Sequence, residues 1–94
     1  MSHDEGRVCS CVTEHRPGID ELDRHHIVPL SWGGPDTEAN VVWICPSQHR
    51  QTHLLLSAYR RAGGTPSWDV RRQFSPFTRA LAQRGWDAFS AAQP

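Results

Sequence analysis

Short runs of apolar residues at strand spacing mark the first half of the chain. The stretch from Leu22 to Leu30 reads as extended, because Ile27-Val28 favour a strand and Pro29 closes it. The segment 41–45 (VVWIC) is β-branched and aromatic throughout and predicts a second strand. Residues 31–40 (SWGGPDTEAN) are rich in Gly, Pro, Asp and Ser and predict a loop. If the two strands pair, they are antiparallel, because this loop is too short to contain a crossover helix.

The pattern changes to helical spacing after the second strand. A helix is expected to start near Pro46, with Ser47 as its N-cap, and to stop at Gly63-Gly64. Its expected apolar side is Leu54, Leu55, Ala58 and Ala62.

Two shorter helices are expected in the remaining chain. Thr65-Pro66 would open the first as cap and first residue, and Ser75-Pro76 would open the second. The second would end at Gly85, with Trp86 and Phe89 packing back on the domain. The elements together indicate a small α+β domain.

Length and composition narrow the class of protein. A chain of 94 residues is one small domain with a modest core, which bound metal would help to stabilise. No stretch is long and apolar enough to span a bilayer, and the start MSHDEGR lacks the layout of a secretory signal. We therefore expect a cytoplasmic protein with no membrane contact. Its three cysteines would be reduced or metal-bound there.

A formal net charge of zero conceals two oppositely charged halves. Residues 1–48 contain three Arg and eight acidic residues, whereas residues 49–94 contain seven Arg and two Asp. All ten basic residues are Arg, whose planar fork fits phosphate oxygens. An Arg-biased genome is an equally good explanation, so the charge pattern permits a nucleic-acid partner without requiring one.

Four of the six histidines fall between residues 25 and 53. His49 and His53 are four apart on the predicted helix, so both imidazoles would share one face and could share an ion. His25 and His26 are adjacent on a predicted strand and would point to opposite sides. One could then reach a metal while the other stays free to take a proton. Taken pair by pair, solvated or chance histidines are the more ordinary explanation.

Asn40 is the only asparagine in the chain and ends the long loop. An amide there can bond to backbone across the loop or to a ring N–H, and either bond would fix the orientation of an imidazole. Gly33-Gly34 in the same loop allow backbone turns that are closed to other residues.

Taken together, the segment RHHIVPLSWGGPDTEANVVWICPSQHRQTH resembles the core of an HNH endonuclease, the family of the ββα-metal (His-Me) finger. The resemblance lies in HH-x-x-P, the GG loop, the Asn before a strand, and C-x3-H-x3-H opening a helix. It implies a ββα-metal core at 9–62, in which an antiparallel hairpin packs on a metal-binding helix. Residues 1–8 would be a flexible tail, and 65–94 a helical C-terminal extension of the same domain.

The resemblance implies a role for each matching residue. His26 matches the general base, and Asn40 the residue that orients the base and braces the loop. His25, His49 and His53 would hold one catalytic divalent metal, which could be Mg²⁺, Mn²⁺, Ni²⁺ or Zn²⁺. His25 matches a position that is Asp or His in relatives, and we count it among the catalytic residues as well.

The implied reaction is hydrolysis of DNA phosphodiester bonds at a single metal, by nicking or double-strand cleavage with low sequence specificity. His26 would take a proton from the attacking water, leaving 5′-phosphate and 3′-hydroxyl ends. Arg24 and Arg50 flank the ligands and could neutralise the phosphate; a surface ion pair is an equally good role for either.

Many members of this family carry a second, structural zinc on two C-x2-C knuckles, from which this chain departs. Its first knuckle is Cys9-Ser10-Cys11, one residue short, and its second has Gln48 where Cys is expected. A structural zinc would use Cys9, Cys11, Cys45 and His15, since zinc needs a fourth ligand. Alternatively the site is lost and Cys45 is a buried strand residue.

Two other functions remain open on the sequence alone. The same fold could serve as a catalytically inactive, zinc-containing DNA-binding module, or as a structural metal domain for protein contacts. Family analogy further suggests a bacteriophage accessory that meets DNA-packaging proteins. The oligomeric state cannot be read from the sequence.

Overall fold

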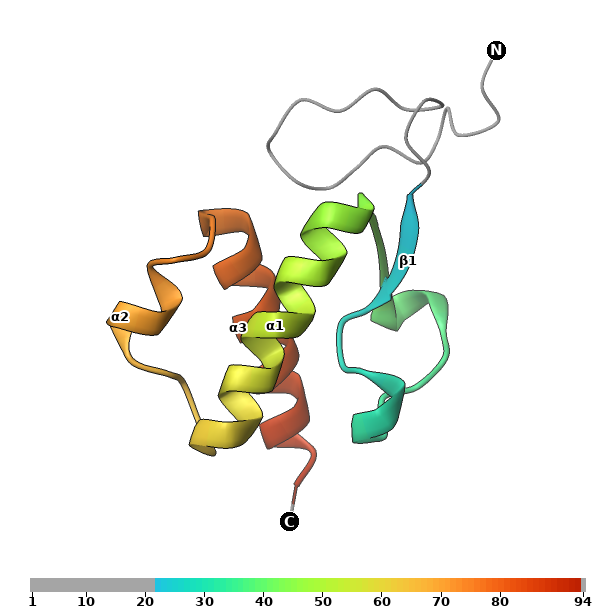
Figure 1. Cartoon of the computed structure of the whole chain (residues 1–94). Helices are drawn as coiled ribbons and strands as arrows, with labels where there is room; N and C mark the ends of the chain where they lie inside the picture. The colour runs from blue at the N-terminus through green and yellow to red at the C-terminus, as the bar shows by residue number, and fades with distance from the viewer. Residues whose placement is uncertain (1–21, 94) are drawn as a thin grey trace.

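A computed structural model describes residues 22–93 of the chain. Two short strands, β1 (Asp23–His26) and β2 (Val41–Ile44), pair antiparallel, with His25 opposite Val42 and His26 opposite Val41. Helix α1 (Pro46–Ala62) follows, then the single-turn α2 (Trp68–Arg71) and α3 (Pro76–Ala91). Figure 1 shows the hairpin on one side of α1 and α2 on the other, with α3 crossing behind α1. The hairpin and its following helix form the ββα-metal fold.

The first strand is shorter than the predicted extended stretch from Leu22 to Leu30. It ends at His26. The backbone N–H of Ile27 still bonds to the carbonyl of Asn40 in the strand register, but the N–H of Val28 bonds to the Asn40 side chain and not to a strand. The predicted loop is also more regular than expected, since it contains two single 3-10 turns, Leu30–Trp32 and Glu38–Asn40. The second strand lies where it was predicted and stops one residue early, at Ile44.

Both ends of α1 follow from local residue chemistry. The N-cap is Cys45 and not the predicted Ser47, because Pro46 takes the first helical position and keeps the residue before it extended. The helix ends at Gly63, as predicted, in the left-handed conformation that closes many helices.

The buried side of α1 differs from the predicted one. Leu54 is 57% exposed, whereas Leu56 and Tyr59 are almost fully buried alongside the correctly predicted Leu55. Tyr59 can be buried because its hydroxyl donates to Gln83 Oε1 of α3 at 2.6 Å. Three consecutive leucines are compatible with more than one apolar face of a helix. Packing against α3 decides which of these faces is buried.

The two C-terminal helices begin and end differently from the predictions in two places. The N-cap of α2 is Ser67, because the Thr65 hydroxyl lies instead against the Gln83 side chain of α3. Ser75 caps α3 as predicted, accepting the backbone N–H of Thr78. The predicted end at Gly85 is wrong, since α3 continues to Ala91 and buries this glycine in mid-helix.

The hydrophobic core has two parts, and α3 contributes to both. Ile27, Ile44 and Leu81 join the hairpin to α3. Leu55, Leu56, Tyr59 and Ala82 join α1 to α3, covered by Trp32, Ala58, Val70, Phe74 and Trp86. None of the helices between residues 22 and 93 combines the length and apolar character that a bilayer span requires.

Gly85 lets α3 approach the strand that carries the histidine pair. A Cβ atom at this position would lie 2.3 Å from the backbone carbonyl oxygen of Ile27. Any side chain here would therefore force α3 away from the end of β1.

Gly85→Ala should lower the free energy of unfolding by about 1–3 kcal/mol, because overpacking against a backbone atom outweighs the better helix propensity of alanine. Urea denaturation measures the effect. Gly64→Ala is the matched control, since a Cβ there meets no atom within 4 Å, and it should change stability little. Equal stability of both variants would contradict this account of the close approach.

Candidate active site

Three imidazoles from two elements converge where β1 crosses the first turns of α1. His25 faces α1 from the strand, and His49 and His53 face the strand from the helix. One nitrogen from each ring lies within 4.8 Å of the others. The ring centroids of His25 lie 5.2 Å from His49 and 5.4 Å from His53. Helical spacing of four and the alternation of strand side chains bring these rings together.

His25 is fully buried, and neither of its ring nitrogens has a hydrogen-bond partner among the described residues. Burial, followed by the neighbouring His49 and His53, lowers the pKa of His25 to about 3, so its ring is neutral at physiological pH. Burial also lowers the pKa of His53. Neutral imidazole is the form that binds metal, and an unpaired buried nitrogen is costly unless something binds it. The donor set therefore fits a divalent cation.

A carboxylate fixes how His49 presents its ring. Asp23 Oδ2 lies 2.8 Å from His49 Nδ1, so Nδ1 donates to the carboxylate and Nε2 carries the lone pair. His49 Nε2 in turn lies 3.0 Å from His53 Nε2. Ligand nitrogens around tetrahedral zinc lie about 3.3 Å apart, so this pair is already near ligand spacing.

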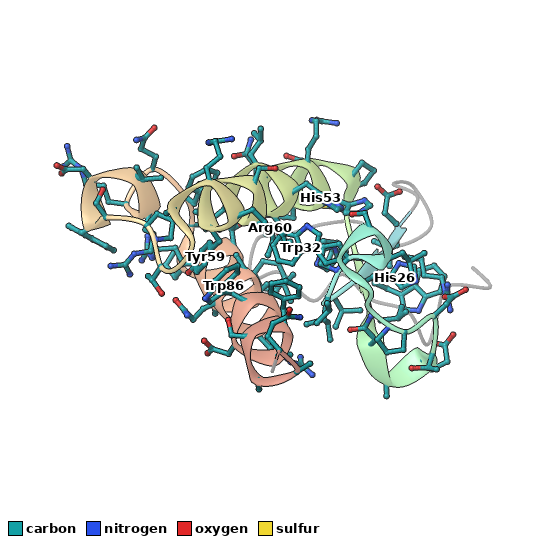
Figure 2. All side chains as sticks on the ribbon, turned by 90° about the horizontal axis from the view of Figure 1, so that it is seen from below. His26, Trp32, His53, Tyr59, Arg60 and Trp86 are labelled. Atoms are coloured by element: carbon teal, nitrogen blue, oxygen red, sulfur yellow. The ribbon has the colours of Figure 1, made fainter. Side chains whose placement is uncertain are left out.

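His26 points away from this trio but opens into the same cleft. The cleft is about 320 Å³ and is lined by Arg24, His26, Pro29, Leu30, Ser31, His49 and His53. The side chain of His26 is 17% exposed, and its Nε2 lies 2.9 Å from Asp36 Oδ1. Figure 2 shows His53 on α1 and His26 beside the loop that follows β1. His26, which is outside the trio, thus shares one opening with two members of the trio, His49 and His53.

Asn40 ties the loop to the end of β1. Its Oδ1 accepts from the backbone N–H of Val28, and its Nδ2 donates to the carbonyls of Val28 and Pro35. Both amide protons are used, so neither is left for an imidazole. Of the two possibilities open from the sequence, the structure has the bonds to backbone. Any influence of Asn40 on His26 therefore passes through the loop.

The loop glycines serve a close approach within the chain. A Cβ at Gly34 would lie 2.0 Å from the carbonyl oxygen of Val28, and Gly33 has a φ of 87°. Gly34 therefore lets the loop lie against the end of β1, next to the bonds made by Asn40.

The two arginines near the histidines differ in their surroundings. Arg24 Nη1 lies 2.8 Å from Asp36 Oδ1, and its Nη2 lies 3.1 Å from Glu38 Oε1. Arg24 thus forms the surface ion pair that was its alternative role, at the wall of the cleft. Arg50 lies exposed on α1, directly after His49.

Of the proposed structural zinc ligands, the structure describes only Cys45; Cys9, Cys11 and His15, like the tail at 1–8, lie outside the described residues. Cys45 is 3% exposed at the start of α1. Gln48, at the position of the missing knuckle cysteine, accepts a hydrogen bond from Thr78 Oγ1 of α3 at 2.7 Å. Its side chain joins two helices.

Two acidic residues of the site were not predicted from the sequence. Asp23 could have been found, because it lies two residues before His25 and therefore on the same side of the strand. Asp36 offered no such signal, since its place beside His26 depends on the path of an irregular loop.

Curated relatives match part of the chain. The Type IV methyl-directed restriction enzyme EcoKMcrA of Escherichia coli K12 is 53% identical over 37 residues, covering 39% of this chain and 13% of that protein. Probable mobile endonuclease B of Enterobacteria phage T4 is 44% identical over 34 residues, covering 36% of this chain and 13% of that protein. An uncharacterized 38.5 kDa protein in psbA intron 1 of Chlamydomonas moewusii is 41% identical over 34 residues, covering 36% of this chain and 10% of that protein. This chain therefore spans only a small part of the length of these relatives.

No solved structure matches the chain at a significant level. Residues 7–54, just over half of the chain, match the family model described as HNH endonuclease. This span includes both strands, the first half of α1, and the histidines at positions 25, 26, 49 and 53. The chain belongs to the HNH endonuclease family.

Proposed function

We propose that this chain is a metal-dependent endonuclease that hydrolyses DNA phosphodiester bonds, by nicking or double-strand cleavage with low sequence specificity. The observation that carries the proposal is that three imidazoles suited to one cation lie together, and that two of them, His49 and His53, share a cleft with a fourth imidazole outside the set, His26. The names of two relatives, a restriction enzyme and a probable mobile endonuclease, support DNA as the substrate.

The roles of the chain's own residues follow from their positions. His25, His49 and His53 would hold the cation, which when bound supplies Lewis-acid stabilisation of the phosphate and of the leaving oxygen. His26 accepts the proton of the attacking water, because its ring opens to the cleft and a neutral imidazole has a nitrogen lone pair that can take a proton. Arg24 and Arg50 would meet the phosphate, Arg24 through the N–H groups that Asp36 and Glu38 leave unused. Asn40 holds the loop that forms one side of this arrangement.

Plasmid nicking by the purified protein across Mg²⁺, Mn²⁺, Ni²⁺ and Zn²⁺, with a chelator control, tests the proposal. His26→Ala should lower the cleavage rate by about 10²- to 10⁴-fold, the usual contribution of a general base, while metal and DNA binding persist. Undiminished cleavage by this variant would show that another group is the base. DNA binding without cleavage by the wild-type protein would favour an inactive DNA-binding module.

Asp23→Asn should weaken metal binding about 10- to 100-fold, because it removes the carboxylate that fixes the ring of His49. Calorimetric titration of the metal-free protein with Zn²⁺ or Ni²⁺ measures the change. Asp69→Asn, at an exposed carboxylate of α2, is the matched control and should leave the affinity unchanged. Equal affinities of the two variants would mean that His49 needs no carboxylate to bind metal.

A structural zinc on Cys9, Cys11, Cys45 and His15 is a separate proposal. Protein purified without chelator should contain more than one metal ion per chain if both sites fill, as measured by elemental analysis. His53→Ala should then remove the ion held by the histidine trio and leave the zinc. One ion or fewer in the wild-type protein would rule out the second site.

A further inference from the structure

We propose that Asp36 is a positioning residue for His26, holding its ring with Nε2 protonated and Nδ1 as the nitrogen that accepts the proton of the attacking water. This inference rests on the proposed function, in which His26 is the base. It assigns a role to a loop residue outside the clustered histidines, and it names the reacting atom of the imidazole.

The tautomer follows from the hydrogen-bond partners of the carboxylate. His26 Nε2 lies 2.9 Å from Asp36 Oδ1, and Arg24 Nη1 lies 2.8 Å from the same oxygen. The hydrogen bond from His26 and the contact with Arg24 lower the pKa of Asp36, so this carboxyl is ionised at neutral pH. An ionised carboxylate only accepts hydrogen bonds, so Nε2 of His26 must be the donor. A neutral imidazole carries one proton, and the lone pair is therefore on Nδ1.

The carboxylate is held from two sides. Arg24 comes from β1, the strand that also carries His26, and binds Asp36 and Glu38 with its two terminal nitrogens. Asn40 Nδ2 donates to the carbonyl of Pro35, the residue directly before Asp36. The strand and the loop thus meet at the atom that contacts the imidazole.

The ion pair is too exposed to matter much for folding. The side chain of Asp36 is 61% exposed and that of Arg24 is 36% exposed. Solvent-exposed ion pairs of this kind contribute little to stability. A substitution at Asp36 should therefore leave the domain folded, and its effects can be read as effects on the ring of His26.

Glu38 provides a matched control within the same loop. It accepts from Nη2 of the same arginine, whereas the carboxylate that His26 contacts is that of Asp36. Asp36→Asn and Glu38→Gln each remove one negative charge beside Arg24. Only the first changes the group against His26 Nε2, and its amide can accept from a protonated Nε2 or donate to a bare one, so it fixes neither tautomer.

Two measurements test the proposal. Nitrogen NMR of isotope-labelled protein, followed over a pH series up to the plateau at which the His26 signals stop changing, reports the tautomer of the neutral ring without any need for cleavage. We expect the Nε2–H form in the wild type and in Glu38→Gln, and a mixture of both forms in Asp36→Asn. In plasmid cleavage, Asp36→Asn should lower kcat about 10- to 100-fold with little change in KM, and Glu38→Gln should stay within about twofold of the wild type.

Several outcomes would overturn the inference. An Nδ1–H form of His26 in the wild type would do so, as would an unchanged tautomer in Asp36→Asn. A higher kcat or a lower KM in Asp36→Asn would instead identify Asp36 as an anion that substrate phosphate must displace. If the wild type cleaves DNA and both variants match it, the proposed function stands and only the role of Asp36 fails. If no metal supports cleavage, the proposed function fails, and NMR still decides how His26 is held.

Discussion

A buried imidazole that has no hydrogen-bond partner between residues 22 and 93 is the constraint on which this structure depends. Desolvating the ring of His25 without a partner is unfavourable, and a cation bound to its unpaired nitrogen would offset that cost. His49 and His53 supply the other two sides of the same space. Asp23, on the strand face that carries His25, orients His49. The first turns of α1 and the start of the hairpin are thereby organised around a position that a cation can fill.

Much of this arrangement can be predicted because it depends on local periodicity. Spacing of four on a helix puts His49 and His53 together whatever the helix packs against. Alternation along a strand separates His25 from His26 in the same way. The helix stop at Gly63 and the cap at Ser75 are equally local, since each depends on the conformational or hydrogen-bonding preference of one residue.

The unpredicted features depend on contacts between distant parts of the chain. Packing against α3 decides which leucines of α1 are buried. Leu56 is therefore buried, and Leu54, which was expected to be buried, is exposed. Gly85 ends no helix, because its role is to admit the carbonyl of Ile27. Asp36 reaches His26 only once Asn40 has set the path of the loop. None of these contacts leaves a periodic signal in the sequence.

The position of α3 sets a limit on how small a working unit of this protein can be. The family match ends at residue 54, yet Ile27 and Ile44 of the hairpin pack on Leu81, thirty-seven residues beyond Ile44. The wall behind the histidine pair is thus made from sequence that the family pattern does not describe. If the matched segment were moved into another protein, that protein would have to supply apolar side chains against Ile27 and Ile44. It would also need a small residue that leaves space for the Ile27 carbonyl.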